Sequence, residues 1–395
     1  MTKTSFHILP VIVTAQFLCT SLWFAGNAIL PDLVLHLQVP ATALVHMTSA
    51  VQFGFITGTL TYAVLLIADR FLPSHVFFWS SLLAAFANLG IVLSGNGIVQ
   101  VLLLRFLTGF FLAGIYPVGM KIASDYFEKG LGKALGFLVG ALVVGTALPH
   151  AVKSLTGFLH WKTVLYITSG FSVAGGTFML FFVPAGPFQQ KMQSFKYSAV
   201  FSIFKNRPFR SAALGYFGHM WELYAFWAFV PFLLMTYKHV HPDVTLDISL
   251  LSFYIIAGGG LACVAGGYLS QIFGAKKTAF VSLFLSGCCC LLSPLAFYLP
   301  PVPFIMFLIF WGLVVIADSP LFSSLVARNA DIQLKGTALT GVTCIGFTIT
   351  IASIELLNYL SVYADPRYIF LVLAIGPAAG LLCMLPVHPK KVMQK

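Results

Sequence analysis

Residues 99–114, VQVLLLRFLTGFFLAG, place a single cation inside an otherwise apolar run. Arg105, Gly109 and Ala113 are four residues apart, so they share one face of a helix. A guanidinium in hydrocarbon is costly unless it faces a cavity or a partner. The small residues beside it would let a neighbouring helix come close. We therefore take Arg105 as a candidate functional residue. The alternative is an Arg near a helix end that extends to the lipid headgroups.

The composition of the chain is that of a membrane protein. The 395 residues are 59% hydrophobic and only 8% charged. The sequence also contains apolar runs of about 20 residues, the length typical of membrane spans. The first run is too long for a signal-peptide core, so we expect it to be an uncleaved span. The seven Cys lie within apolar runs and lack metal-ligand spacing, so we expect no disulfide and no metal site.

The apolar runs predict an all-α membrane protein with twelve transmembrane helices, arranged as two pseudo-symmetric six-helix bundles. The longest polar connection follows the sixth run. We therefore expect an N-terminal bundle over 1–184, a cytoplasmic linker over 185–209 and a C-terminal bundle over 210–395. The expected spans are 8–30, 43–68, 75–94, 98–124, 133–157, 162–184, 210–236, 246–272, 276–298, 303–327, 335–361 and 366–386.

The basic residues indicate how the chain is oriented. Most Lys and Arg fall in loops on one side of the twelve spans, which places both termini and the central linker in the cytoplasm. We expect the protein to be located in the plasma membrane, which in a bacterium is the inner membrane. The net charge of +11 is spread over these loops, so we expect no nucleic-acid partner.

The two halves of the sequence share landmarks. A shift of about 203 residues places Gly109 on Gly312 and Pro117 on Pro320, which argues for a duplicated six-helix unit of the kind found in transporters. Chance matching of Gly and Pro in an apolar chain is the alternative.

These residues resemble the major facilitator superfamily over the whole chain. The Arg105, Gly109 and Ala113 pattern is similar to the span-4 motif of the family, and Asp69-Arg70 is similar to the start of its cytoplasmic loop motif. The resemblance implies a cytoplasmic gate that includes Asp125. In the second half the loop motif keeps its Gly and basic residues but has Gln271 in place of the acid. The residues kept there are Gly274, Lys276 and Lys277.

One departure limits the resemblance to the antiporter branch of the family. The span-5 glycine motif of the antiporter branch ends in Gly-Pro, but here Gly145 leads to Ala147-Leu-Pro149-His150. That mismatch argues mildly against drug–proton exchange. Resemblance to the organic-anion and cyanate-permease-like bacterial branch is loose.

Span 5 carries further ionisable groups. His150 and Lys153 are three residues apart on one helical face, and Pro149 frees a backbone carbonyl beside them. With Arg105 they would form a wall that attracts anions, because three cations in a low dielectric repel each other without an anion or carboxylate among them. The alternative has Lys153 extending outward and His150 neutral and hydrogen-bonded.

Span 7 holds the sequence His219-Met-Trp221-Glu222. Glu222 lies about 12 residues, or roughly 18 Å, from the start of its span, and so near the middle of the membrane. A carboxyl group at that depth could carry a proton, together with His219 and His150. Trp221 and Trp227 could line the same cavity and stack on a solute. The resemblance implies that spans 1, 4, 7 and 10 line the cavity. The alternative for Glu222 is a structural hydrogen bond between helices.

Three more polar residues are candidates for solute binding. Glu355 falls at the depth of His150 in the other half, so we expect it to meet His150 or Lys153 across the interface in one state and to part from them in another. Asp318 precedes Pro320 and either binds solute or caps a broken helix. Asn27 in span 1 is a weaker candidate.

The sequence thus predicts a secondary active transporter that exposes a central site to each side in turn. We expect proton-coupled symport of a small anionic or zwitterionic organic solute by a monomer. An exporter of metabolites, siderophore-like molecules or drugs is the alternative in the same fold, and a non-transporting receptor is the alternative of another class. We expect no cofactor and no enzyme activity, because phosphate-binding loops and nucleophile–base pairs are missing.

Overall fold

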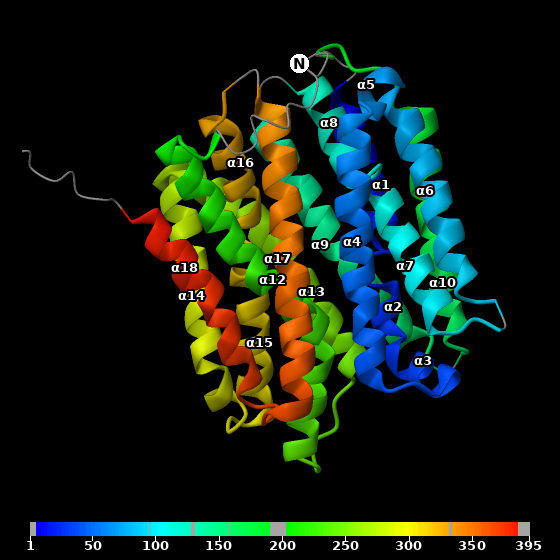
Figure 1. Cartoon of the computed structure of the whole chain (residues 1–395), viewed down its shortest axis with the longest axis vertical. Coiled ribbons are helices and arrows are strands. Elements are labelled where there is room, and N and C mark those ends of the chain that lie inside the picture. Colours follow the sequence, from blue (N-terminus) through cyan, green and yellow to red (C-terminus); the bar gives the residue numbers. More distant parts are fainter. Residues whose placement is uncertain are drawn as a thin grey trace, which may run out of the picture.

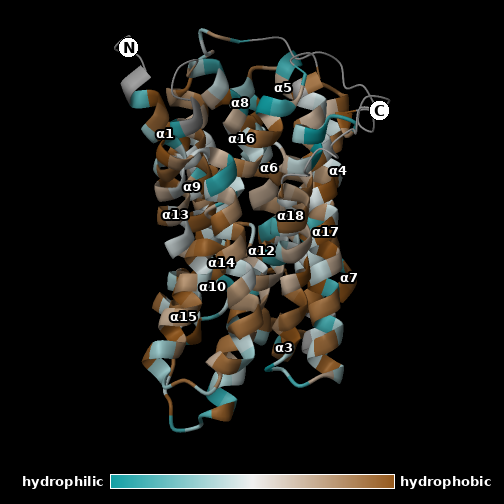
Figure 2. Cartoon of the chain, turned by 90° about the vertical axis from the view of Figure 1, so that its left-hand side faces the viewer, coloured by the Kyte–Doolittle hydropathy of each residue, from teal (hydrophilic) through white to brown (hydrophobic). Residues whose placement is uncertain are grey.

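The computed structural model describes residues 5–93, 95–127, 131–157, 159–189, 203–331 and 334–385, and these ranges contain helices and no strand. The helices stand side by side along the long axis of the molecule (Figure 1). Apolar residues cover their middle portions and hydrophilic residues gather toward the two ends (Figure 2). Seven of the helical stretches in the described ranges are long and apolar enough to cross a bilayer.

The first six expected spans each contain helix. They are α1 (Ser5–Thr20) with α2 (Ala25–Ala28) and α3 (Leu30–Leu37), α4 (Ala41–Val64), α6 (Pro73–Gly90), α7 (Ile98–Leu112) with α8 (Tyr116–Tyr126), α9 (Leu131–Leu155) and α10 (Lys162–Phe182). A short helix, α5 (Ile67–Arg70), joins α4 to α6.

The last six spans are likewise helical. They are α12 (Arg207–Val240), α13 (Ile248–Phe273), α14 (Ala275–Ala296), α15 (Pro301–Val314) with α16 (Ser319–Asn329), α17 (Lys335–Tyr363), and η2 (Ile369–Ala374) with α18 (Ile375–Met384). The fold class predicted from the apolar runs is confirmed. The expected linker lies largely outside the described residues, so the domain boundaries stay a prediction.

The fourth span of each half is broken at the same place. α7 ends at Leu112 and α8 begins at Tyr116, whereas α15 ends at Val314 and α16 begins at Ser319. Pro117 and Pro320 occupy the first turn of α8 and α16, where a missing backbone N–H costs little. The break therefore repeats with the shift of about 203 residues that relates the two halves.

Glycine packing repeats with the same shift. A Cβ on Gly109 would lie 2.0 Å from the backbone oxygen of Val51, and a Cβ on Gly312 would lie 2.0 Å from that of Ile255. Only Gly lets α7 lie this close to α4, and α15 this close to α13. The duplicated unit thus retains its helix contacts as well as its helix order.

The halves meet mainly along two helix pairs. α9 packs against α13, and α4 packs against α17. We name the two ends of the molecule by the short helices found there. The α5 end also carries α8 and α16, and the α3 end is opposite (Figure 1).

Candidate functional site

Arg105 is fully buried inside the N-terminal half. Its Nη1 donates to the backbone oxygen of Leu22 at 3.1 Å and to Asn88 Oδ1 at 3.3 Å, and its Nη2 donates to the backbone oxygen of Trp23 at 2.5 Å. Leu22 and Trp23 lie in the turn between α1 and α2. Carbonyls just beyond a helix end lack partners within the helix, and a cation there is favourable. Arg105 therefore stabilises the break in the first span.

The contacts of Arg105 continue into a third helix. Asn88 on α6 donates to Thr168 Oγ1 at 3.2 Å and to Ser169 Oγ at 2.9 Å, both on α10. No carboxylate among the described residues forms an ion pair with Arg105. The guanidinium thus neither reaches the headgroups nor has its charge balanced within this part of the chain.

Glu222 is fully buried in the C-terminal half. Its Oε1 accepts from Trp311 Nε1 at 2.6 Å and from Cys290 Sγ at 3.2 Å, and its Oε2 accepts from Ser286 Oγ at 2.9 Å. All three donors are neutral groups on α14 and α15. The other buried carboxylates of the described residues, Asp125 and Asp318, each have a basic partner. Glu222 differs from them because its charge has no such partner there.

The Arg105 and Glu222 sites occupy equivalent places in the two halves. Arg105 joins the first, third and fourth spans, and Glu222 joins the seventh, ninth and tenth. With a shift of about 203 residues, Asn88 falls next to Cys290, and Arg105 falls about one turn from Trp311. Each half therefore has one buried charge at this three-helix junction, positive in the first half and negative in the second.

His219 and Asp318 form a second buried pair near Glu222. His219 Nδ1 lies 2.8 Å from Asp318 Oδ1, and each side chain is 1% exposed. Asp318 precedes α16 in the break of the tenth span, but its side chain makes no capping hydrogen bond. The structure therefore places Asp318 beside His219 rather than in the role of a helix cap.

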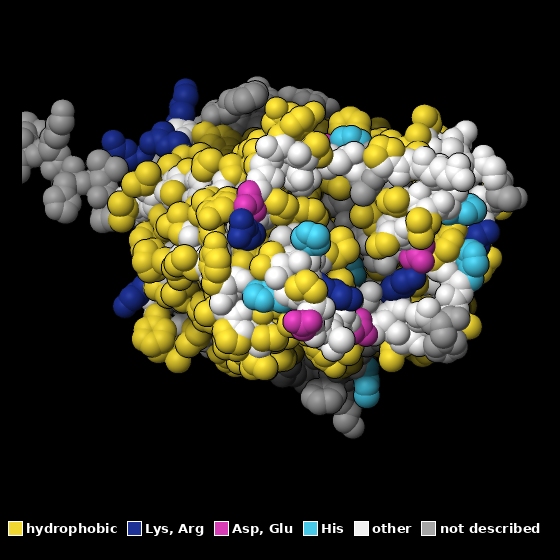
Figure 3. Space-filling view, turned by 90° about the horizontal axis from the view of Figure 1, so that it is seen from below, with side chains coloured by type: hydrophobic (Ala, Val, Ile, Leu, Met, Phe, Trp, Pro, Cys, Tyr) yellow, Lys and Arg dark blue, Asp and Glu magenta, His cyan; other side chains and the backbone are white. Residues whose placement is uncertain are grey.

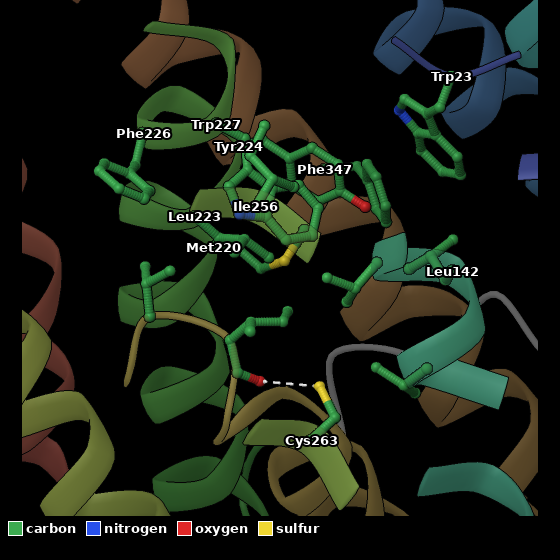
Figure 4. Close-up of a cluster of buried hydrophobic side chains, with 14 of the residues drawn as sticks. Trp23, Leu142, Met220, Leu223, Tyr224, Phe226, Trp227, Ile256, Cys263 and Phe347 are labelled. Carbon is green, nitrogen blue, oxygen red and sulfur yellow. Dashed lines mark hydrogen bonds between the residues drawn. The ribbon is translucent and has the colours of Figure 1, made fainter. Parts of the chain in front are cut away.

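Aromatic side chains from both halves meet at the interface. We call Trp23, Phe55, Tyr224, Trp227 and Phe347 the central aromatic cluster. The ring of Trp23 lies 5.8 Å from the rings of Tyr224 and of Phe347, and these last two rings are 5.2 Å apart. Phe55 lies 4.5 Å from Phe347, and Trp227 lies 5.4 Å from Tyr224. Figure 4 shows Trp227, Tyr224 and Phe347 together, with Trp23 facing them from the turn between α1 and α2 of the N-terminal half.

The two Trp residues predicted in span 7 have different surroundings. Trp227 belongs to the central aromatic cluster, whereas Trp221 donates its N–H to the backbone oxygen of Val372 at 3.1 Å. That contact directs Trp221 toward η2, inside the C-terminal half. Trp23 and Phe347 were missed by sequence reasoning, because an aromatic residue in an apolar run gives no signal of its own.

The structure does not gather the expected wall of cations into one cluster of contacts. Lys153 Nζ lies 2.7 Å from Asp32 Oδ2 on α3, at the edge of the molecule. His150 is buried on α9, and its Nε2 has no hydrogen-bond partner among the described residues. Asn27 Nδ2 donates to Thr48 Oγ1 at 2.8 Å, which ties α2 to α4.

In this conformation Glu355 contacts neither His150 nor Lys153, so their pairing in another state stays a prediction. Glu355 lies 2.9 Å from His46 Nδ1 and also accepts from Ser49 Oγ. The reason is the order of the helices: α17, which carries Glu355, packs against α4, whereas His150 and Lys153 lie on α9.

Four polar contacts between described residues join the halves at the α3 end, and we call them the α3-end latch. They are His46 and Ser49 with Glu355, Asn358 Nδ2 with the backbone oxygen of Thr42 at 3.2 Å, and Ser154 Oγ with Asp247 Oδ2 at 2.5 Å. Seen from this end, acidic, basic and His side chains are interspersed among apolar ones (Figure 3). The latch closes the two halves against each other there.

The α5 end contains the predicted loop-motif residues. Lys121 Nζ lies 3.2 Å from Asp69 Oδ1 and 3.4 Å from Asp125 Oδ2, so one Lys that the sequence did not single out joins α5 to α8. Arg70 is exposed at the end of α5. In the second half, Gly274 has a φ of +86° between α13 and α14. Among the described residues no ion pair involves Arg70 or the other two predicted cations, Lys276 and Lys277.

Comparisons with known proteins agree with this architecture. A family model described as the Major Facilitator Superfamily matches residues 12–353. The chain is 25% identical over 249 residues to a "Probable L-galactonate transporter" of Escherichia coli (strain K12), and this match covers 56% of the chain and 53% of that relative. The chain thus spans about half the length of this curated relative.

Two solved structures share the fold. The proton:xylose symporter XylE, bound to 6-bromo-6-deoxy-D-glucose, matches with a TM-score of 0.74 and 12% identity, over 96% of this chain and 95% of that one. The nucleoside transporter NupG matches with a TM-score of 0.71 and 15% identity, over 95% and 98% of the two chains.

Proposed function

This chain belongs to the major facilitator superfamily, and we propose that it imports a small, hydroxylated organic anion together with protons. Its family makes it an integral multi-pass membrane transporter of a small-molecule solute rather than an enzyme. The class of solute and the coupling ion are inferred from the buried charges.

The observation that carries the proposal is the pair of unbalanced charges at equivalent junctions. Arg105 has no acidic partner and Glu222 has no basic partner among the described residues. Burying an unpaired charge is strongly unfavourable, so such groups persist where function needs them. A transported anion would balance Arg105, and a transported proton would neutralise Glu222. Together these two cargoes remove both unbalanced charges.

The position of Arg105 links it to the interface between the halves. The guanidinium binds the backbone of Trp23, and the ring of Trp23 lies in the central aromatic cluster. An anion held between the halves would therefore be attracted by the positive charge of Arg105, which lies behind the α1–α2 turn. The galactonate named for the curated relative is a hydroxylated anion of this kind.

Glu222 is suited to carry a proton because its partners are neutral. An O–H or N–H donor can remain beside a carboxyl group in either protonation state, whereas a salt-bridged partner strongly favours the charged form. A second protonatable pair is available for the coupling: His219 lies one turn from Glu222 on α12, and Asp318 lies at the break of the tenth span.

The latch indicates which side is closed. Basic residues at the α5 end, such as Arg70, Lys121 and Arg328, support a cytoplasmic α5 end and cytoplasmic termini. The α3-end latch would then close the outer side of a protein in the inner membrane of a bacterium. We propose that the monomer is the transporting unit, because each half contributes to one central site.

Uptake into proteoliposomes tests the proposal. Purified protein is assayed with radiolabelled galactonate and, as the uncharged comparison, xylose, under a pH gradient of either sign. An acidic exterior should drive galactonate accumulation, and xylose should not accumulate. Accumulation only under the opposite gradient would identify an exporter. Equal transport of both solutes without any effect of the gradient would contradict the proposal.

A further inference from the structure

Trp23, Trp221, Trp227 and Trp311 are buried or partly buried, and they differ in how their indole N–H groups are paired. Trp311 donates to Glu222 at 2.6 Å, and Trp221 donates to a backbone oxygen at 3.1 Å. The N–H groups of Trp23 and Trp227 have no acceptor among the described residues, although both side chains are fully buried. A buried donor without an acceptor destabilises a protein, and each such group requires an explanation.

The two unpaired donors lie in one place and come from different halves. Trp23 follows α1 in the N-terminal half, and Trp227 lies on α12 in the C-terminal half. The ring of Tyr224 is 5.8 Å from that of Trp23 and 5.4 Å from that of Trp227, so it bridges them (Figure 4). A Phe at either position would supply a ring without an unpaired N–H. The indole groups therefore point to an acceptor brought from outside the chain.

We infer that the indole N–H groups of Trp23 and Trp227 donate hydrogen bonds to two oxygens of the transported solute, one from each half of the protein. The rings of Tyr224 and Phe347 pack against its C–H face. A polyhydroxylated acid such as an aldonate supplies both features, since it has hydroxyl and carboxylate oxygens on a carbon chain. This inference rests on the proposed function and assigns the residues that select the solute.

Arg105 acts on this site through Trp23. Its hydrogen bonds to the backbone oxygens of Leu22 and Trp23 hold the turn from which the indole extends. Arg105 is thus a positioning residue for Trp23 as well as the source of positive charge. Because the two donors belong to different halves, a solute that binds both also favours the approach of the halves.

Conservative variants separate the N–H group from the ring. W23F and W227F keep an aromatic ring and remove the donor, and W79F is the control because Trp79 is exposed on α6. For galactonate uptake, each of the first two variants should raise KM about 3- to 10-fold, the loss expected for one hydrogen bond. W79F should leave KM unchanged.

A set of monodeoxy galactonates identifies the partner oxygens. In the wild-type protein, removal of the hydroxyl that accepts from Trp23 should raise KM, but in W23F the same removal should have no further effect. The same logic applies to Trp227. Wild-type uptake of galactonate combined with an unchanged KM in both variants would overturn the inference while leaving the proposed function intact.

Thermal unfolding of solute-free protein in detergent gives a test that needs no solute. W311F loses a hydrogen bond to Glu222 in addition to side-chain volume, whereas W23F and W227F lose volume alone. Their Tm should therefore fall less than that of W311F. If wild-type protein took up no aldonate, the proposed function would fail and this comparison would decide whether the donors are unpaired. An equal fall in all three variants would show that they have partners within the protein, which would overturn the inference.

Discussion

Arg105 shows how far a single side chain can be understood from sequence. A lone cation in an apolar run predicts a buried functional group, and the structure buries it completely. Its partners could not be predicted, because two of them are backbone oxygens, which every residue carries. The same limit applies to Glu222, whose donors Ser286 and Cys290 come from an apolar run with no polar pattern.

Replacing Arg105 by Lys should lower both stability and uptake. A Lys ammonium cannot match the fork that reaches Leu22, Trp23 and Asn88 together. At least one buried acceptor would lose its donor, at a cost of about 1–3 kcal/mol. Chemical denaturation in detergent measures the change in unfolding free energy. The control is Arg367→Lys, in the loop after α17, which should have little effect. R105K with wild-type stability would contradict the clamp on the α1–α2 turn.

Helix positions were easier to predict than helix breaks. Apart from the first span, which continues as helix to Leu37 instead of ending near residue 30, the apolar runs placed the spans to within a few residues, because burial in lipid needs a long continuous apolar segment. The break between α7 and α8 was not predicted, since Pro117 lies after it and Gly114 can continue a helix. Conversely, α9 runs through Pro149 without a break. Contacts with neighbouring helices determine whether a helix breaks at such a residue, and these contacts cannot be read from the sequence of a single span.

Close packing of α4 on α7 makes Gly109 sensitive to substitution. A Cβ at Gly109 would lie 2.0 Å from the backbone oxygen of Val51, so Gly109→Ala must push the two helices apart. We expect a loss of stability of about 1–3 kcal/mol, as for other overpacked sites. Gly170→Ala on α10 is the matched control, because nothing lies within 4 Å of its Cβ. It should be neutral or slightly stabilising. Equal Tm values for the two variants would refute the close approach.

The α3-end latch predicts a shift between conformations. Glu355→Gln weakens the contact with His46 and should open this end more often. Double electron–electron resonance between nitroxides on the exposed residues Leu35 and Tyr363, one in each half, should show a larger population at long distance. Asp365→Asn, which lies outside the latch, is the control and should keep the wild-type distribution. A distribution unchanged by Glu355→Gln would exclude a gating role.

The whole molecule consists of two related halves with opposite buried charges. Matching breaks and matching glycine contacts preserve the duplicated plan, while Arg105 and Glu222 make the halves chemically different. The repeat was visible in the sequence through Gly and Pro landmarks. The equivalence of the two charged junctions was not visible in the sequence. Equivalent positions in the two halves carry different residue types, and the residues of each junction come together only in the folded structure.

The most direct test of proton coupling follows protons and solute separately. Galactonate is added to weakly buffered proteoliposomes, and the external pH is recorded for wild type and Glu222→Gln. Equilibrium exchange of labelled galactonate is measured in parallel, since exchange needs solute binding without net proton movement. The wild-type protein should alkalinise the medium, whereas the variant should exchange solute without alkalinisation. Alkalinisation by Glu222→Gln at the wild-type rate would contradict the role of Glu222 as the proton carrier.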